Sequence, residues 1–324
     1  MSEDSMDRPI QVSIICNAFN QEAYIREALE SFVMQQTTFA FEVLVHDDAS
    51  TDNTPSIIKE FEEKYPEIIK PIYQTENKYS QGISVSGTFQ FPRVSGKYVA
   101  FCEGDDYFTD PQKLQKQFDA LEAHPEIDIC AHAADQVDAT TKELISIVSP
   151  RKEETVIPVE DVIMGEGGFV ATNSLMYRAE LNRDIPEFRR HFDFDYALQI
   201  HGSLRGGMLF LPDRMAVYRY MSVGSWTSKR AKSSEFRKRL LERKQRMLKE
   251  LDEYTAHAYG KTVSFRMLQN EFEHLYSENE YKAAFNKKYR SVYMRNGALG
   301  YLKLRVKALF PSLTGIKRKL RRKR

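Results

Sequence analysis

The sequence has few features of secreted or membrane-spanning proteins. Its three cysteines, Cys16, Cys102 and Cys130, are an odd number without the spacing of a disulfide framework. No apolar run approaches the roughly 18 residues that a membrane-spanning helix requires. The opening stretch MSEDSMDRP is too acidic and polar for a secretory signal peptide. These absences predict a cytoplasmic protein with reduced cysteines.

The chain also lacks the glycine-rich loops of two large nucleotide-binding classes. No GxGxxG follows the first predicted strand, which disfavours a dinucleotide-dependent oxidoreductase. The GEGG stretch at residues 165–168 has neither the Lys-Ser/Thr of a P-loop nor the dinucleotide spacing, so we interpret it as a tight turn. The sequence therefore offers no glycine-loop nucleotide site.

Charge is distributed unevenly, although the formal net charge is only +1. Residues 301–324 contain ten Lys or Arg and no acid, which leaves 37 basic and 46 acidic residues, a net charge of −9, in the first 300. Apolar residues interleave with this basic charge, namely Leu302, Leu304, Val306, Leu309, Phe310, Leu313 and Ile316. This mixture favours an anionic bilayer surface, with helical packing as the main alternative. We predict peripheral attachment at the inner face of the cell membrane and no nucleic-acid partner.

Short apolar strands alternate with amphipathic helices over the first part of the chain. VSIIC (12–16), FEVLV (41–45) and KYVAF (97–101) are typical of buried strands, and helical periodicity follows each of them. This alternation predicts an α/β fold with a largely parallel sheet. Ligands of such sheets bind outside the carboxyl ends of the strands.

Each of these three strands ends in a polar cluster. The clusters are NAFN (17–20), HDDAST (46–51) and CEGDD (102–106), and we expect them to converge on one site. In the third cluster Glu103, Asp105 and Asp106 crowd three carboxylates at the end of an apolar strand. Such crowding is consistent with a divalent cation, with an acid/base pair, or with a solvated turn that caps the next helix.

Taken together, the ordered motifs resemble the family 2 glycosyltransferases of the GT-A fold. The resemblance rests on VSIICNAFNQEAYIREALESFVMQQ, FEVLVHDDASTDNT and GKYVAFCEGDDYFTDPQKLQKQF, and it covers residues 12–225. It implies a Rossmann-like, mostly parallel central sheet flanked by helices, with a C-terminal helical extension. We therefore predict a GT-A domain over residues 1–227, a helical extension over 228–300 and a basic amphipathic tail over 301–324.

The resemblance assigns a donor site to the first two clusters. Asn17 and Phe19 would lie at the nucleobase end, and Asp48 would accept a hydrogen bond from the base ring. Asp47 is better explained as a cap of the following turn.

In the third cluster the resemblance implies a variant DxD motif. Asp105 would bind Mn²⁺ or Mg²⁺, Glu103 would approach the ribose or the metal shell, and Asp106 would be a second metal ligand or would orient the first. Gly104 leaves room for close approach of backbone.

The segment HFDFDYALQIHGSLRG implies the catalytic base. By the resemblance, Asp195 matches the base position. Asp193 lies two residues earlier and would point to a different side of the helix, so we expect only one of the two to face the site, and the resemblance favours Asp195. Trp226 is interpreted as an acceptor platform or lid. Where the family often carries a metal-binding His, this sequence has Met221, whose thioether is a poor ligand for Mn²⁺ or Mg²⁺.

The function that these assignments imply is metal-dependent, inverting sugar transfer. The donor would be a nucleotide-diphosphate sugar, with UDP favoured by the resemblance, and the acceptor a hydroxyl of a glycan or lipid-linked molecule in O-antigen or capsule synthesis. Two alternatives stay open at this point. One is a sugar nucleotidyltransferase, and the other is a non-catalytic nucleotide-binding or scaffolding module.

Overall fold

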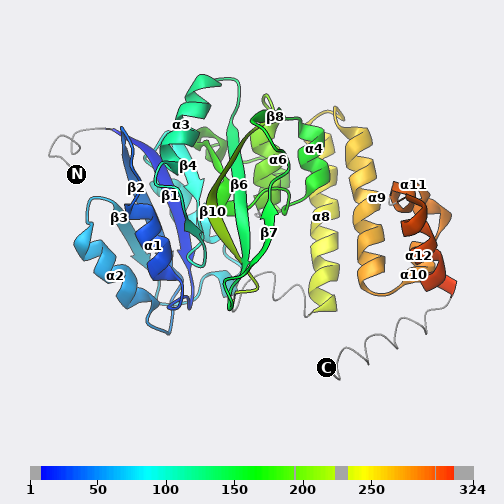
Figure 1. Ribbon diagram of the computed structural model, residues 1–324, viewed down its shortest axis with the longest axis horizontal. Helices are drawn as coiled ribbons and strands as arrows, with labels where there is room; N and C mark the ends of the chain where they lie inside the picture. The colour runs from blue at the N-terminus through cyan, green and yellow to red at the C-terminus, as the bar shows by residue number, and fades with distance from the viewer. Residues whose placement is uncertain (1–8, 193–194, 223–232, 296, 310–324) are drawn as a thin grey trace. The chain divides into compact units, whose positions relative to one another are not determined.

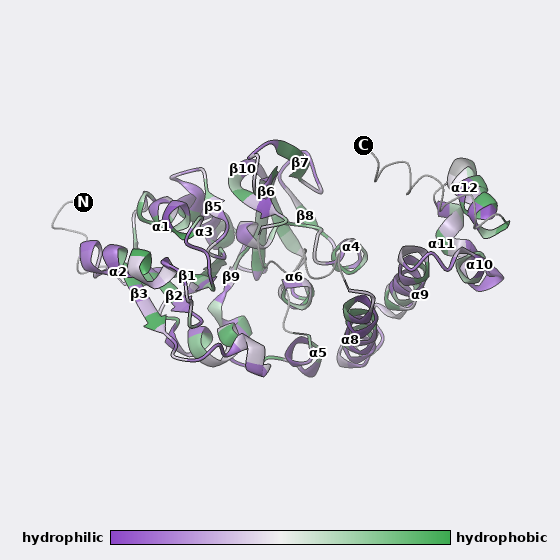
Figure 2. Ribbon diagram, turned by 90° about the horizontal axis from the view of Figure 1, so that it is seen from below, coloured by the Kyte–Doolittle hydropathy of each residue, from purple (hydrophilic) through white to green (hydrophobic). Residues whose placement is uncertain are grey.

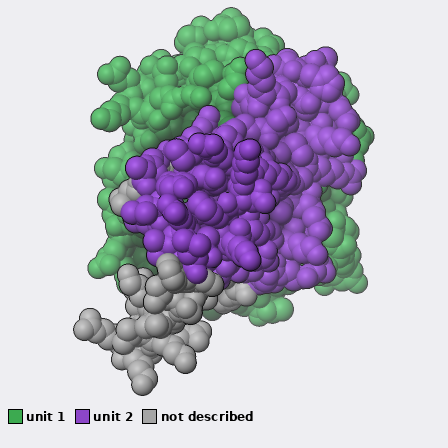
Figure 3. All heavy atoms as spheres, turned by 90° about the vertical axis from the view of Figure 1, so that its right-hand side faces the viewer, with its two compact units in different colours: residues 1–227 green, residues 228–324 purple. Residues whose placement is uncertain are grey.

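A computed structural model describes residues 9–192, 195–222, 233–295 and 297–309. The chain divides into two compact units, residues 1–227 and residues 228–324 (Figure 3).

The first unit is built on one curled sheet with helices around it (Figure 1). The strand order is β3-β2-β1-β4-β9-β6-β10-β5, with β7 paired to β6 and β8 paired to β10. The strands are β1 (Ile10–Ala18), β2 (Ala40–Asp47), β3 (Ile69–Tyr73), β4 (Tyr98–Phe101), β5 (Tyr107–Phe108), β6 (Ile129–Asp138), β7 (Leu144–Val148), β8 (Thr155–Ile157), β9 (Met176–Arg178) and β10 (Met208–Tyr220). The α-helices are α1 (Ile25–Val33), α2 (Thr54–Lys64), α3 (Lys113–Ala123), α4 (Val159–Gly165), α5 (Glu187–Arg190) and α6 (Asp195–Ser203). The predicted α/β class is therefore confirmed.

Strands β1 to β4 form the parallel part of the sheet that the sequence predicts. β1 pairs in parallel with β2 on one side and with β4 on the other. The strand order therefore reverses at β1, since β2 and β3 are added on one side of it and β4 on the other. Val12, Ile14 and Ile15 are fully buried because elements cover both faces of β1, which explains its continuous apolar run. A ligand of a doubly wound sheet binds beside such a reversal, outside the carboxyl ends of the strands.

The rest of the sheet is mixed rather than parallel. β9 runs antiparallel to both β4 and β6, whereas β6 and β10 are parallel to each other. β9 is only three residues long, and residues Thr172–Ser174 just before it form a 3₁₀ turn. This turn brings a polar segment to the edge of the predicted site.

The second unit is helical. It contains α8 (Ser234–Tyr254), α9 (Gly260–Ser277), α10 (Tyr281–Ala284), α11 (Arg290–Arg295) and α12 (Gly297–Leu309). Its core is aromatic, with Phe272, Tyr289 and Tyr293 among the buried side chains. α8 is hydrophilic along most of its length (Figure 2). α12 continues across residue 300, and Leu304 on its inner face is only 3% exposed.

Helices in the described ranges are all too short or too polar to cross a bilayer.

Candidate active site at the strand ends

The ends of β1 and β4 bring the first and third polar clusters together. The Asn17 N–H donates to Glu103 Oε2 at 3.2 Å, and Asn17 Nδ2 lies 3.4 Å from Glu103 Oε1. The Gly104 N–H donates to the Asn17 carbonyl at 3.0 Å. Asn17 Nδ2 also donates to Ser86 Oγ at 3.0 Å. The parallel pairing of β1 with β4 thus fixes a contact between two clusters that sequence analysis had only assigned to the same site.

Glu103 lies in an environment that disfavours its charge. Burial is the main cause that raises the pKa of Glu103 to about 7, and the neighbouring Asp105 carboxylate raises it further. The hydrogen bonds from Asn17 act in the opposite direction. Glu103 is therefore partly protonated near neutral pH when no cation or other donor group lies beside it.

Arg219 on β10 contacts the acidic cluster through both its side chain and its backbone. It is 2% exposed, its Nη1 donates to the Asp105 carbonyl at 2.6 Å, and its backbone N–H donates to Asp106 Oδ1 at 2.8 Å. Its guanidinium forms an ion pair with Glu27 of α1. It also lies over the Tyr107 ring, 4.5 Å from the centroid. Arg219 therefore joins β10, α1 and residues 105–106 into one assembly.

Asp106 is the most enclosed of the three carboxylates. It is 3% exposed, and burial followed by repulsion from Asp105 raises its pKa well above the usual range. Its hydrogen bond from the Arg219 backbone directs the carboxylate toward β10. This geometry suits a residue that orients the loop.

Ser222 occupies the position next to Asp105 after β10 ends. Its hydroxyl donates to Asp105 Oδ2. Burial raises the pKa of Asp105, and the Ser222 hydrogen bond opposes that shift. Met221, which replaces the metal-binding His of the family, has a φ of 64° and is 39% exposed. Ser222, three positions downstream of Arg219, therefore contacts the acidic cluster in addition to Arg219.

Asp48 is held by backbone groups of the following loop. One carboxylate oxygen accepts the Lys78 N–H at 2.7 Å and the other accepts the Tyr79 N–H at 3.0 Å. Asp47 Oδ2 accepts the Ser50 N–H at 3.2 Å, which agrees with the predicted turn cap. Phe19 is 46% exposed beside this region of the strand ends. Sequence analysis did not predict that Asp48 would accept hydrogen bonds from the Lys78 and Tyr79 backbone, because Asp48 and Lys78 are 30 positions apart.

Asp195 begins α6 and belongs to the same electrostatic region as the strand ends. Its charge is one of the causes that raise the pKa of Glu103. Thr172 Oγ1 donates to Asp195 Oδ2 at 2.6 Å. Asp193 and Trp226 lie outside the described residues. The structure thus brings the predicted base toward the acidic cluster from the second half of the unit.

Gly104 is closely packed against side chains of the segment that follows β1. A Cβ at this position would lie 2.3 Å from Gln21 Oε1 and 2.8 Å from Ile25 Cδ1. The missing side chain therefore leaves room for the side chains of Gln21 and Ile25.

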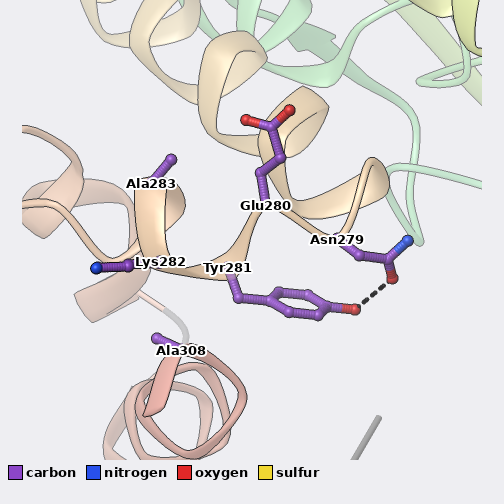
Figure 4. A pocket seen from close by; sticks show the side chains of 6 residues that line it. All are labelled: Asn279, Glu280, Tyr281, Lys282, Ala283 and Ala308. Carbon is purple, nitrogen blue, oxygen red and sulfur yellow. Dashed lines mark hydrogen bonds between the residues drawn. The ribbon is translucent and has the colours of Figure 1, made fainter. Parts of the chain in front are cut away.

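A hollow of about 490 Å³ in the second unit has no comparable chemistry (Figure 4). It is lined by Asn279, Glu280, Tyr281, Lys282, Ala283 and Ala308. The Tyr281 hydroxyl donates to Asn279 Oδ1 at 2.7 Å, so two of its polar groups satisfy each other. The strand ends of the first unit are the better candidate for a reaction site.

Comparisons with known proteins agree with the geometry of the first unit. The sequence profile described as "Glycosyl transferase family 2" matches residues 13–185. An uncharacterized protein of Mycobacterium tuberculosis is 38% identical over 222 residues, which cover 67% of this chain and 61% of that protein. An uncharacterized glycosyltransferase of Nostoc sp. is 28% identical over 240 residues, or 70% of this chain and 71% of that protein. The matched stretch thus spans less than two thirds of the mycobacterial relative.

A solved structure shares the fold at low sequence identity. S. aureus TarS 1-349, in complex with UDP-GlcNAc, superposes with a TM-score of 0.63 and 17% identity, covering 91% of this chain and 79% of that chain. The profile match spans more than half of the sequence and includes all three strand-end clusters. The chain therefore belongs to glycosyl transferase family 2.

Proposed function

We propose that this chain transfers a sugar from a nucleotide-diphosphate donor to an acceptor hydroxyl by a single displacement that inverts the anomeric carbon. The observation that carries the proposal is the convergence of residues 103–106 with Asp195, which influences the pKa of Glu103 across the site. The carboxylates of residues 103–106 are suited to the donor diphosphate, and Asp195 is suited to the acceptor. Family membership supports the same reaction class.

In this proposal the donor nucleotide lies along the ends of β1 and β2. Asn17 and the exposed Phe19 ring flank the nucleobase. Asp48 accepts a base N–H, which would replace one of its present bonds from Lys78 or Tyr79. UDP is the favoured nucleotide, and the complex of TarS with UDP-GlcNAc supports that choice by analogy of fold.

A divalent cation, Mn²⁺ or Mg²⁺, fits the acidic cluster in its chemistry. Asp105 and Glu103 are partly buried carboxylates whose pKa values are raised, and a cation would offset the repulsion between them. Among the described residues no group of three or more His, Cys, Asp or Glu is gathered for metal binding, so donor phosphates and water would supply the other ligands. When bound, the cation would stabilise the diphosphate leaving group. Asp105 is the principal ligand, with Asp106 as a second ligand or an orienting group.

Asp195 acts as the general base for the acceptor. It takes the proton of the attacking hydroxyl, which makes that oxygen nucleophilic as the bond to the leaving nucleotide breaks. Trp226 supplies an acceptor platform. The acceptor class is a glycan or a lipid-linked molecule of surface polysaccharide synthesis, such as O-antigen or capsule.

Attachment to the inner face of the membrane would bring the enzyme to lipid-linked acceptors. Leu302, Val306 and Leu309 are 53%, 44% and 61% exposed, and they recur at helical spacing on the outer face of α12. Lys303 and Arg305 are exposed on the same helix. An apolar stripe beside basic charge is suited to an anionic bilayer surface. We propose that this face, continued by the basic tail, is the membrane contact.

Two observations bear on the alternatives. Arg26, the one basic residue in the segment after β1, is paired with Glu60 at 2.6 Å, which disfavours a nucleotidyltransferase. Met221 in place of a metal-binding His keeps the scaffold alternative open to test.

The test measures sugar transfer and donor hydrolysis with Mn²⁺ or Mg²⁺, together with nucleotide binding by calorimetry. We expect turnover by the wild type and loss of turnover with retained nucleotide binding in Asp195→Ala. Nucleotide binding without any product across a panel of donors and acceptors would support the scaffold instead.

A further inference from the structure

We propose that Thr172 is a positioning residue for the Asp195 carboxylate, and that Gly167 leaves the space which this orientation requires. The inference rests on the proposed role of Asp195 as the base. Thr172 Oγ1 donates to Asp195 Oδ2 at 2.6 Å, so the hydroxyl holds one oxygen of the carboxylate from a neighbouring element.

The turn that carries Thr172 is itself firmly held. Asn173 is fully buried and its Nδ2 donates to the Val217 carbonyl of β10 at 2.8 Å. The Ser174 carbonyl accepts Gln117 Nε2 of α3 at 2.9 Å. Because the two residues that follow Thr172 are hydrogen-bonded to core elements, the backbone that carries its hydroxyl is held in place beside Asp195. A β-branched side chain also restricts χ1, which reduces the freedom of that hydroxyl.

Gly167 approaches the same carboxylate from the opposite segment of chain. A Cβ at Gly167 would lie 2.9 Å from Asp195 Oδ1, a distance shorter than those at which Cβ atoms contact other heavy atoms in proteins. Gln199, one helical turn after Asp195, donates from Nε2 to the Gly167 carbonyl at 3.2 Å. The GEGG stretch is therefore packed against the first turn of α6, a role that its interpretation as a simple turn did not include.

This arrangement has a chemical consequence for proton transfer. A general base must keep its acceptor oxygen in line with the attacking hydroxyl, and small misplacements of reacting groups reduce rates strongly. A hydroxyl that donates to a carboxylate also favours its ionised form, which is the form that accepts a proton. Thr172 therefore acts on kcat through Asp195 without touching the substrate.

The test compares Thr172→Val with Thr172→Ser. We expect Val, which keeps the shape and removes the hydroxyl, to lower kcat about tenfold to a hundredfold with little change in the donor KM. The acidic limb of its rate profile should move to higher pH. Ser should restore most of kcat and the original profile. Thr37→Val is the matched control, because Thr37 Oγ1 makes a bond of equal length, 2.6 Å, to the Phe39 carbonyl away from the site.

A second pair of variants tests the space beside the carboxylate. Gly167→Ala should reduce kcat, whereas Gly168→Ala should not, because a Cβ at Gly168 meets nothing within 4 Å. Thermal unfolding of each variant separates a local effect from loss of fold.

The results also distinguish this inference from the proposed function. If Asp195→Asn is inactive while Thr172→Val and Gly167→Ala fold and match the wild type in kcat and pH profile, the positioning role is wrong and the base assignment stands. If Asp195→Asn retains full activity, the base assignment itself fails, and Thr172 has no carboxylate to position for catalysis.

Discussion

Charged residues lie in opposite environments at the strand ends of the first unit and along α8 of the second unit. In the first unit Asp106 and Arg219 are almost completely buried and are hydrogen-bonded to backbone groups. In the second unit a typical pair, Glu235 and Arg239 on α8, is 68% and 73% exposed. Buried charge destabilises a fold unless it is fully paired, whereas exposed pairs contribute little. The difference indicates that the strand ends maintain buried charge for a site, while the charged pairs along α8 keep the surface of that helix hydrated.

The largest expected effect lies at Asp195. Asp195→Asn should lower the rate of sugar transfer by about 10²- to 10⁴-fold, because the amide cannot take the acceptor proton. Donor binding, measured by calorimetry, should stay near the wild-type value. Glu235→Gln on α8 is the control and should leave the rate unchanged. A modest loss shared by both variants would remove the contrast between the units.

The next largest expected effect is on stability, and it compares the buried Arg219 with the exposed Arg239. Arg219→Met should lower the free energy of unfolding by about 2–4 kcal/mol, since it removes the bonds to Asp105 and Glu27. Arg239→Met should change it by no more than about 0.5 kcal/mol. Urea unfolding followed by circular dichroism measures both. Equal losses would mean that burial of Arg219 has no special structural value.

A third prediction concerns pH. The pKa of Glu103 is raised to about 7 from its ordinary value of about 4.5, so folding favours its protonated form. The stability that comes from this protonated form is complete below about pH 4.5 and is lost as pH rises toward 7. In urea unfolding of the EDTA-treated protein, the free energy of unfolding of the wild type should therefore fall between about pH 4.5 and pH 7. In Glu103→Gln this fall should be smaller by about 1–3 kcal/mol. Glu63→Gln, an exposed position on α2, should keep the wild-type slope; a steeper decline in Glu103→Gln would contradict the sign.

The smallest expected effect tests the outer face of α12. Replacing Leu302, Val306 and Leu309 by Ser should weaken binding to vesicles of anionic lipid about tenfold, because three exposed apolar side chains are lost. Cosedimentation measures the bound fraction. Leu304→Ser is the contrasting variant, since Leu304 packs inward and its loss should lower thermal stability instead. Unchanged vesicle binding by the triple variant would exclude this face as the membrane contact.

The sequence predicted best what is local to one strand and the loop after it. The alternation of strands and helices gave the α/β class, and the NAFN and CEGDD clusters proved to be neighbours because β1 pairs with β4. The antiparallel strand β9 could not be predicted from the sequence, since a strand of three residues is too short to show a periodic pattern.

Contacts between distant segments were not predictable in the same way. Arg219 and Asp105 are 114 positions apart, and Thr172 and Asp195 are 23 apart without a shared helix or strand. Neither pair leaves a spacing pattern in the sequence. Asp48 shows the same limit, because its carboxylate meets a loop whose path the strand pattern does not determine.

Gly104 constrains how the acidic motif can change over evolutionary time. A Cβ there would meet the ends of the Gln21 and Ile25 side chains, both of which are flexible. An exchange at position 104 therefore requires these two side chains to move, which couples the acidic motif to the segment that leads into α1.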